Sequence, residues 1–342
     1  MASSTSWPPG CVAPRSGHVA AEGAPVASEF ELIARHLTPA APGPDAGVPL
    51  GVGDDCALLA PRPGRQLAVS VDTSVVNVHF PADAPAEAIG YRALAVSLSD
   101  LAAMGAEPRW CLMALALEHN DETWLAQFAR GFHALCETSN TALVGGDVTR
   151  GQLAIGVTVI GDVPAGEALT RGGARPGDTL AVTGALGGGA GGLALWQRGE
   201  RDLGHPLLTR YLKPTPRLAA GVALRGLVHA AIDVSDGLLA DLEHVLAASG
   251  VGAQLEPEAL PLATGLSEAL GMAAAYRAAL CGGDDYELLV SLPGERLDEA
   301  RRRLAAQGLA LTPIGSVSAE PGVRGVDLGG AHGWQHFPGG AP

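Results

Sequence analysis

The sequence predicts an α+β protein with two domains. At 342 residues the chain is long enough for two hydrophobic cores, and 47% hydrophobic with 17% charged residues is typical of a soluble globular protein. Strand-like and helix-like patterns alternate along the chain. Aspartates beside glycines recur where the predicted strands end. These observations predict two α+β domains that are joined near residues 161–176.

The first 25 residues differ in composition from the remainder of the chain. Residues 1–25 are rich in Ser, Pro, Ala and Gly and have no apolar core, so we expect a disordered extension without a signal peptide. The predicted domains then span residues 26–161 and 162–342.

The longest uncharged stretch, residues 179–197, is interrupted by six glycines. We expect it to form a strand, a turn and a helix and not a membrane span.

The first domain is predicted to alternate helices and strands. Its predicted elements are a helix over 30–37, a strand over 66–72, helices over 87–104 and 124–137, and strands over 140–147 and 152–160. Ser28 is placed to cap the first helix, and Gly105 to end the second. The strand over 66–72 delivers Asp72 at its end. Ser97 and Asp100 lie three residues apart and therefore share one helix face.

The second domain repeats the alternation. Its predicted elements are strands over 177–183, 230–234, 287–292 and 311–317, helices over 190–197 and 295–307, and a further helix after the strand over 230–234. Ser235 or Asp236 is placed to cap the helix that Gly250 ends. A glycine cluster over 186–192 precedes a helix, and its backbone N–H groups are candidates for cradling a phosphate. An ordinary glycine-rich turn is the alternative.

Charge limits the classes of partner. The net charge of −14 disfavours binding to a nucleic-acid backbone. Lys213 is the only lysine and follows no glycine-rich loop, which excludes a Walker A phosphate loop. An acidic protein that binds phosphates therefore needs metal ions, with arginine as its fixed cation.

The cysteines favour a reducing, cytoplasmic location. The five cysteines are odd in number, widely spaced and without a C-x-x-C pair, which argues against a disulfide framework and a zinc site. Cys56 and Cys281 adjoin acidic motifs, but we expect both to be small buried hydrophobic residues.

Eight aspartates stand where predicted strands end or helices begin: Asp54, Asp55, Asp72, Asp147, Asp233, Asp236, Asp284 and Asp285. Carboxylates in such places can converge on one cleft, and hard divalent cations prefer oxygen ligands. The pattern indicates a magnesium and polyphosphate site. Simple turns explain Asp54 and Asp55 equally well, and helix capping explains one of Asp233 and Asp236. Asp100 on its apolar helix requires a cation if it is buried.

Six motifs follow one another along the chain: EFELIAR at 29–35, GDDCALL at 53–59, ALAVSLSDLAAMGA at 93–106, GGDVTRG at 145–151, DVSDG at 233–237 and GGDDYEL at 282–288. In order and approximate spacing, this set resembles the thiamine-monophosphate kinase family of the aminoimidazole ribonucleotide synthetase-like superfamily. The resemblance runs from residue 29 to residue 337.

The resemblance implies a two-domain α+β fold of that superfamily, a homodimer that pairs N-terminal sheets, and transfer of the ATP γ-phosphoryl group to thiamine monophosphate with several Mg²⁺ ions. Implied magnesium ligands are Asp55, Ser70, Val71, Asp72, Asp100, Asp147, Asp233 and Asp236, with Val71 acting through its carbonyl. Positions implied around ATP are Gly146, Asp147, Arg171 and Ser235. Positions implied on the thiamine-phosphate side are His79, Asp284 and Trp334.

The roles of two of the implied residues can also be inferred from their side-chain chemistry, independently of the family resemblance. The aromatic face of Trp334 suits a cationic thiazolium ring or a pyrimidine, although a Trp packed on the core is the alternative. Arg171 is the best-placed cation near the glycine cluster, and a surface Arg is its alternative. The chain departs from the family at Asp284, where Glu is usual, at the glycines that follow Gly187, and over residues 74–78.

No general base is expected in this reaction. A phosphate monoester has its second pKa near ~6 and is already a nucleophile at neutral pH, so direct in-line transfer needs positioning and charge neutralisation. The alternatives are another ATP-dependent synthetase of the superfamily and a non-catalytic magnesium-nucleotide-binding protein. The selenophosphate enzyme is expected to carry a reactive Cys and Lys near its N-terminus, and no such Lys exists here.

Overall fold

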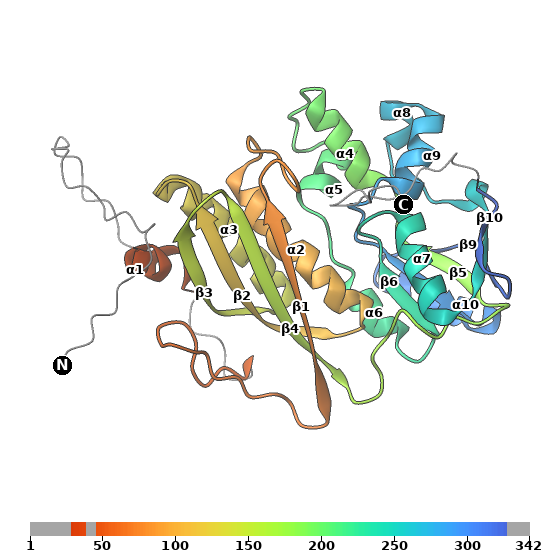
Figure 1. Ribbon diagram of the computed structural model, residues 1–342, viewed down its shortest axis with the longest axis horizontal. Helices are drawn as coiled ribbons and strands as arrows, with labels where there is room; N and C mark the ends of the chain where they lie inside the picture. Colours follow the sequence, from red (N-terminus) through yellow and green to blue (C-terminus); the bar gives the residue numbers. More distant parts are fainter. Residues whose placement is uncertain (1–28, 39–45, 327–342) are drawn as a thin grey trace, which may run out of the picture.

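Two β-sheets, one in each half of the chain, organise the fold (Figure 1). The structure is a computed structural model that describes residues 29–38 and 46–326. The predicted N-terminal extension and the predicted cap Ser28 lie outside these residues. The sheets, helices and two-domain plan agree with the predicted α+β class.

The first half contains a four-stranded sheet in the order β1-β4-β2-β3. Helices α2 and α3 pack together and cover one face of it (Figure 1). The elements are α1 (Glu29–Leu32), the π-helix η1 (Ile33–Leu37), β1 (Arg65–Val75), α2 (Ala86–Ala103), β2 (Glu107–Leu117), α3 (Glu122–Ser139), β3 (Ala142–Arg150) and β4 (Ala154–Pro164).

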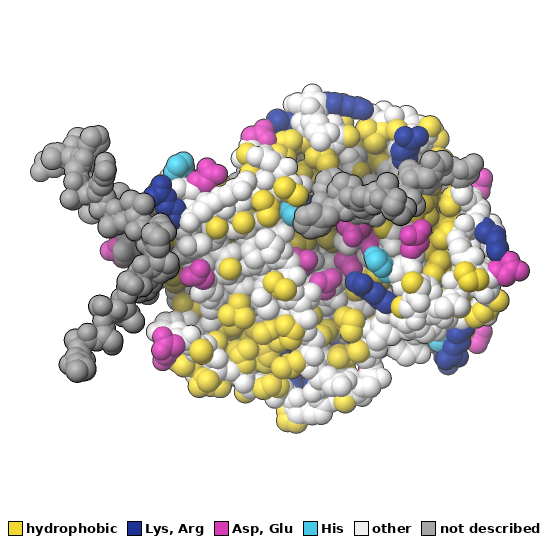
Figure 2. All heavy atoms as spheres, in the orientation of Figure 1, with side chains coloured by type: hydrophobic (Ala, Val, Ile, Leu, Met, Phe, Trp, Pro, Cys, Tyr) yellow, Lys and Arg dark blue, Asp and Glu magenta, His cyan; other side chains and the backbone are white. Residues whose placement is uncertain are grey.

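Strand β1 lies at one edge of this sheet and alternates strictly between its two faces. Leu67, Val69 and Val71 are 47%, 62% and 63% exposed, on the face away from the helices. Ser70 and Asp72 lie on the opposite side, because successive side chains of a strand alternate. Figure 2 shows hydrophobic side chains gathered over the face of the sheet that the helices leave open.

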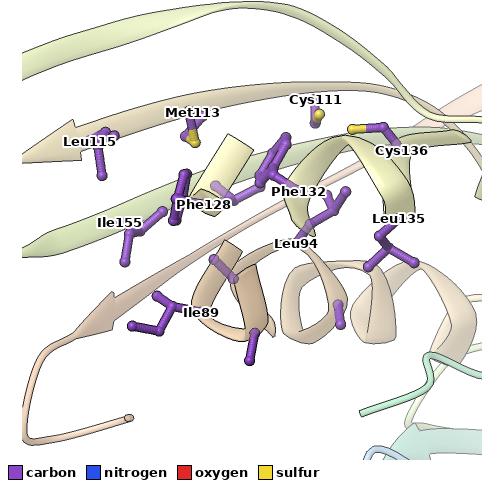
Figure 3. Close-up of a cluster of buried hydrophobic side chains, with 14 of the residues drawn as sticks. Ile89, Leu94, Cys111, Met113, Leu115, Phe128, Phe132, Leu135, Cys136 and Ile155 are labelled. Atoms are coloured by element: carbon purple, nitrogen blue, oxygen red, sulfur yellow. The ribbon is translucent and has the colours of Figure 1, made fainter. Parts of the chain in front are cut away.

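The core of the first half lies between the sheet and helices α2 and α3. Figure 3 shows Ile89 and Leu94 of α2 together with Phe128 and Phe132 of α3 beneath the sheet. The rings of Phe128 and Phe132 stack with centroids 6.2 Å apart. This apolar packing holds α2 firmly against the sheet, and α2 carries Asp100.

The second half contains a mixed six-stranded sheet in the order β10-β7-β9-β5-β8-β6. Its strands are β5 (Thr179–Thr183), β6 (Ala230–Asp233), β7 (Gly252–Leu255), β8 (Leu288–Leu292), β9 (Leu311–Ser318) and β10 (Gly322–Arg324). Its helices are α4 (Gly188–Gln197), α5 (Pro206–Leu212), α6 (Leu218–Leu224), α7 (Leu238–Ser249), α8 (Leu266–Leu270), α9 (Met272–Cys281) and α10 (Leu297–Ala305), with the 3-10 helices η3 (Pro257–Ala259) and η4 (Gly294–Arg296).

Helix α2 joins the two halves. It packs on β1 and β4 of the first sheet and also contacts α6 and β6 of the second half. A Cβ atom at Gly221 of α6 would lie 2.0 Å from the carbonyl oxygen of Ala102, so the helices cross at a distance that only glycine permits. In addition, Trp196 of α4 and Tyr211 of α5 join the core of the first half.

The predicted elements exist, but several bounds were wrong. The strand over 152–160 continues to Pro164, because residues up to Pro164 still pair with β1. The helix over 295–307 begins as a 3-10 turn and ends at Ala305. Strands β2, β7 and β10 and helices α5, α6, α8 and α9 are absent from the predicted set. Strand β2 is buried between β3 and β4 and has no clear polar alternation to reveal it. Within the described residues, no helix is both long and apolar enough to cross a membrane.

Candidate active site

A cleft of about 610 Å³ lies between the two halves. The first half contributes the end of β1, the loop after it and one face of α2; the second half contributes Leu193, the segment after β6 and the segment after α9. Residues at the cleft include Val71, Asp72, His79, Arg92, Asp100, Asp233, Ser235, Asp236, Asp284 and Tyr286. Figure 2 shows acidic side chains gathered in the middle of the molecule, between the sheets.

Three carboxylates at this cleft repel one another: Asp72 of β1, Asp100 of α2 and Asp233 of β6. Burial, followed by the charge of Asp100, raises the pKa of Asp72 to about 6. Burial, followed by the charges of Asp100 and then Asp72, raises the pKa of Asp233 to about 7. Among the described residues no Lys or Arg pairs with any of the three. They therefore form a site that lacks its positive charge.

Serine hydroxyls hold two of these carboxylates. Ser70 donates to Asp100, and Ser99 donates to Oδ2 of Asp233 at 2.7 Å. Hydrogen bonds of this kind favour the charged form and fix the carboxylate orientation, but they supply no charge. Asp100 is only partly buried, and no described Lys or Arg side chain pairs with it.

The segment after β6 is ordered by a carboxylate that the sequence analysis missed. Asp241, in the first turn of α7, accepts the backbone N–H groups of Ser235, Asp236 and Gly237 at 3.0–3.1 Å. The prediction that Ser235 or Asp236 caps this helix is therefore wrong. The N-cap is Gly237, and it makes no side-chain cap bond. Asp233 and Asp236 are both left at the cleft.

The glycine cluster that begins α4 is not an open phosphate cradle. The N–H groups of Gly187 and Gly189 donate to the carboxylate of Asp285 at 2.7 and 3.3 Å. A Cβ atom at Gly189 would lie 2.3 Å from the carbonyl oxygen of Asp284, so this glycine permits close packing. Burial raises the pKa of Asp285 to about 7. The anion at this helix end is a protein carboxylate, contrary to the predicted role in phosphate binding.

A second cavity of about 600 Å³ lies in the first half, beside β3. It is bordered by the turn over 52–57 and by β3 residues that include Gly145, Gly146 and Asp147. Asp54 and Asp55 are exposed in that turn, where Oδ1 of Asp54 accepts the N–H of Asp55 at 2.8 Å. The predicted metal ligands that border a cavity are thus distributed over two: Asp55 and Asp147 here, and Val71, Asp72, Asp100, Asp233 and Asp236 at the cleft. The predicted ligand Ser70 borders neither cavity and donates to Asp100.

One cysteine prediction was wrong. Cys56 borders the second cavity and is exposed, although a buried residue was expected. Cys281 is half-buried. The cysteines that act as small core residues are Cys111 and Cys136, whose sulfur atoms lie near one another in Figure 3.

The predicted acceptor-side residues have different surroundings. His79 borders the cleft, and its Nδ1 accepts the N–H of Val75 at 2.9 Å, so the proton of a neutral ring is on Nε2. Asp284 borders the cleft and pairs with Arg92. Arg171 is exposed and borders neither cavity. Trp334 lies outside the described residues.

Arg92, Tyr211 and Tyr286 were missed by the sequence analysis. Arg92 is 3% exposed, and its guanidinium lies 5.0 Å from the Tyr211 ring centroid and 5.9 Å from that of Tyr286. The available signal was a single charged residue in the otherwise uncharged segment 88–98 of α2. A buried Arg on such a helix face needs an anionic partner, which is Asp284.

The donor set suits magnesium, although no closed metal group is formed by the protein. Among the described residues, no group of three or more His, Cys, Asp and Glu side chains is arranged to hold a metal ion. Nevertheless, Asp72, Asp100 and Asp233 are oxygen donors, and burial followed by the charge of Asp100 raises the pKa of Asp72 and of Asp233. This fits Mg²⁺, which usually binds through one or two carboxylates together with water and substrate phosphates.

Comparison with known proteins identifies two domains of one family. Residues 53–163 match AIR synthase related protein, N-terminal domain, and residues 175–327 match its C-terminal domain. The chain is 43% identical to thiamine-monophosphate kinase of Salmonella typhimurium over 296 residues, 85% of this chain and 91% of that protein. It is 35% identical to thiamine-monophosphate kinase of Bacillus subtilis over 299 residues, 84% of this chain and 91% of that protein.

Solved structures give the same result. The crystal structure of thiamine-monophosphate kinase from Stenotrophomonas maltophilia superposes with a TM-score of 0.79 at 44% identity, over 86% of this chain and 94% of that chain. The complex of AaThiL with AMPPCP and TMP superposes with a TM-score of 0.73 at 31% identity, over 81% of this chain and 89% of that chain. The chain belongs to the thiamine-monophosphate kinase family.

Proposed function

We propose that this protein transfers the γ-phosphoryl group of ATP to thiamine monophosphate, giving thiamine diphosphate and ADP. The observation that carries the proposal is the cleft with its uncompensated Asp72, Asp100 and Asp233, which fits a reaction between two polyanions. The relatives at 35–43% identity bear the name of this activity. A structural neighbour holds AMPPCP and TMP together.

The residues that the family resemblance places around the two substrates lie at both cavities. We assign Gly146 and Asp147, beside the second cavity, to ATP, and we assign Ser235 to ATP from its place at the cleft. His79 and Asp284 are assigned to the thiamine-phosphate side of the cleft. The predicted roles of Arg171 at ATP and Trp334 at thiamine stay predictions.

The chemical step needs no general base from the protein. An oxygen of the acceptor phosphate forms a bond to the γ-phosphorus while the bond between that phosphorus and the β,γ-bridging oxygen breaks, and the electron pair leaves with ADP. The acceptor oxygen is already anionic near neutral pH. The protein's contribution is to align the two substrates and to offset their repulsion.

We propose that Asp72, Asp100, Asp233 and Asp236 hold magnesium at the cleft, with Ser70 and the Val71 carbonyl beside them, and that Asp55 and Asp147 hold it at the second cavity. Bound Mg²⁺ would neutralise phosphate charge during transfer. Ser70 and Ser99 hold the carboxylates of Asp100 and Asp233 in place, which reduces reorganisation when ions arrive with the nucleotide.

We further propose a homodimer formed through the first sheet. Leu67, Val69 and Val71 expose apolar side chains on the open face of edge strand β1, and uncovered faces and edges of this kind favour pairing with another chain. Light scattering should give twice 34.5 kDa at micromolar concentration. Val69→Glu should give a folded monomer, and a wild-type monomer would contradict the proposal.

The free thiols of Cys56, Cys111, Cys136 and Cys281 support a reducing cytoplasmic location.

The experiment that tests the activity measures ADP release with ATP and Mg²⁺, with and without thiamine monophosphate, and identifies the product by chromatography. We expect ADP release that depends on the acceptor, with one thiamine diphosphate formed for each ADP. ADP release with another acceptor alone would favour a different synthetase of the superfamily. Nucleotide binding without turnover would favour the non-catalytic alternative.

A further inference from the structure

Arg92 joins the two halves of the molecule beneath the cleft. Its Nη1 donates to the carbonyl oxygen of Tyr211 at 2.6 Å, and its Nη2 donates to Oδ1 of Asp284 at 2.6 Å. Arg92 belongs to α2, whereas Tyr211 and Asp284 belong to the second half. Among the described residues that border the cleft it is the only Lys or Arg.

The Arg92 side chain borders the cleft but is almost completely enclosed. It is 3% exposed, with the Tyr211 and Tyr286 rings near its guanidinium, and its Nε is buried without a hydrogen-bond partner in the described part of the chain. The Asp284 side chain, in contrast, is 27% exposed and borders the cleft. Of this ion pair, Asp284 is therefore the member that presents the larger surface to the cleft.

The segment that carries Asp284 has an unusual backbone. Asp284 has φ of 60° and Tyr286 has φ of 52°, and both residues are in the left-handed region that glycine favours. Non-glycine residues persist there only when surrounding contacts hold them, and such residues concentrate at functional sites. Here the N–H groups of Asp284 and Tyr286 donate to the carbonyl oxygens of Ser235 and Val234, both at 2.8 Å.

The two oxygens of Asp284 are used unequally. Oδ1 accepts from Arg92 and also from the Tyr286 hydroxyl, at 2.6 and 2.8 Å. In the described residues nothing donates to Oδ2. A carboxylate fixed through one oxygen presents the other with a defined direction, which is how a binding group is oriented before its ligand arrives.

We propose that Arg92 is a positioning residue for the acceptor substrate: it holds Asp284 across the junction of the halves so that Oδ2 accepts a hydrogen bond from an N–H or amino group of the acceptor. Tyr286 assists through the same Oδ1. The inference rests on the proposed function and on the assignment of Asp284 to the acceptor side, and it adds the residues that set the direction of that carboxylate.

Steady-state kinetics with thiamine monophosphate and ATP test the proposal in the wild type and in the variants Arg92→Gln, Arg92→Lys, Asp284→Asn and Arg92→Gln/Asp284→Asn. Arg92→Gln should raise the KM for the acceptor about tenfold, the scale of a lost charge-assisted hydrogen bond. The KM for ATP and kcat should change less than about twofold. Arg92→Lys keeps the charge and should recover part of the loss.

The double variant separates positioning from a general structural effect. If Arg92 acts through Asp284, Arg92→Gln adds nothing to the acceptor KM in the Asp284→Asn background. Multiplied effects in the double variant, or equal increases in both KM values, would overturn the proposal. Arg217→Gln is the matched control. Arg217 pairs with the buried Glu287 at a distance of 2.5 Å, and neither residue borders the cleft. It should lower stability and leave the acceptor KM unchanged.

Tyr286→Phe provides a second test if Arg92→Gln does not fold. It removes one neutral donor to Oδ1 and keeps the ring, so the acceptor KM should rise about threefold without a change in the KM for ATP. An unchanged acceptor KM in a folded Tyr286→Phe would contradict the inference. Failure of the proposed function is distinguishable, because the wild type itself would then show no ADP release that depends on thiamine monophosphate.

Discussion

Two carboxylate clusters in this molecule have the same chemistry and opposite surroundings. At the cleft, Asp72, Asp100 and Asp233 face one another without a basic partner, and burial together with mutual repulsion raises the pKa of Asp72 to about 6 and of Asp233 to about 7. At the far end of the first sheet, Glu107 and Asp162 are surrounded by three arginines: Arg62, Arg65 and Arg225.

The arginine-paired cluster behaves in the opposite way. Burial alone would raise the pKa of Glu107, but hydrogen bonds and charge from Arg62 and Arg65 outweigh it and lower the pKa to about 2. The same partners lower the pKa of Asp162. Acids that fold with their counter-charges stabilise the structure, whereas the cleft acids repel one another and have no Lys or Arg partner among the described residues.

The largest expected effect separates the two clusters by activity. Asp72→Asn removes an anionic ligand at nearly constant volume, so turnover should fall by about 100-fold or more. Asp147→Asn at the second cavity should have a comparable effect. Glu107→Gln, in the arginine-paired cluster, should keep turnover within about threefold of the wild type. ADP release at limiting Mg²⁺ measures all three, and wild-type rates for both Asp variants would refute the metal assignment.

The second effect separates the clusters by stability. Asp162 has a side chain that is 1% exposed, whereas its partners Arg62 and Arg65 are 36% and 17% exposed. Asp162→Asn leaves these two partly exposed guanidinium groups short of a counter-charge and should lower the free energy of unfolding by about 2 kcal/mol. Asp233→Asn removes a repelling charge and should raise the free energy of unfolding of the protein without Mg²⁺. Chemical denaturation at pH 8 in a chelator measures both. Loss of stability in both variants would remove the distinction between the clusters.

The third effect concerns the missing positive charge. A cation that binds only the folded state stabilises it, so Mg²⁺ should raise the Tm of the wild type by a few degrees. Asp72→Asn and Asp233→Asn should lose most of this increase, while Asp162→Asn should keep it. Thermal unfolding with and without Mg²⁺, at constant ionic strength, gives the comparison. An equal shift in all variants would indicate general screening and not a site.

The smallest effect is a pH dependence in the arginine-paired cluster. The pKa of Glu107 is about 2 in the folded protein, whereas its ordinary value is 4.5. Between these two pH values the unfolded state therefore binds more protons than the folded state. The stabilisation by Glu107 is therefore complete above about pH 4.5 and is lost as the pH falls toward 2. The stability difference between the wild type and Glu107→Gln should shrink over that window. It will be modest, because the Glu107 side chain is 35% exposed.

The sequence was most informative where local chemistry decides the outcome. Strand alternation predicted β1, although the strand continues past Asp72 to Val75, and six motifs predicted the family that the comparisons show. The helix that carries Asp100 was predicted to within a residue at each end. In contrast, Ser235 and Asp236 resemble capping residues by type, and only the fold shows that Asp241 binds the N–H groups around them.

Aspartates beside glycines near predicted strand ends were sufficient to predict a magnesium and polyphosphate site, because residue type and strand periodicity are local properties. Which aspartates share a cavity was decided by the tertiary structure alone. The tertiary structure also decided that Asp285, 98 residues from Gly187 along the chain, accepts the N–H of Gly187 at the start of α4. Arg92 and Asp284 are 192 residues apart, and their contact exists only because α2 packs against both halves. Pairings of this kind depend on how helices and sheets pack, and a one-dimensional pattern does not contain that geometry.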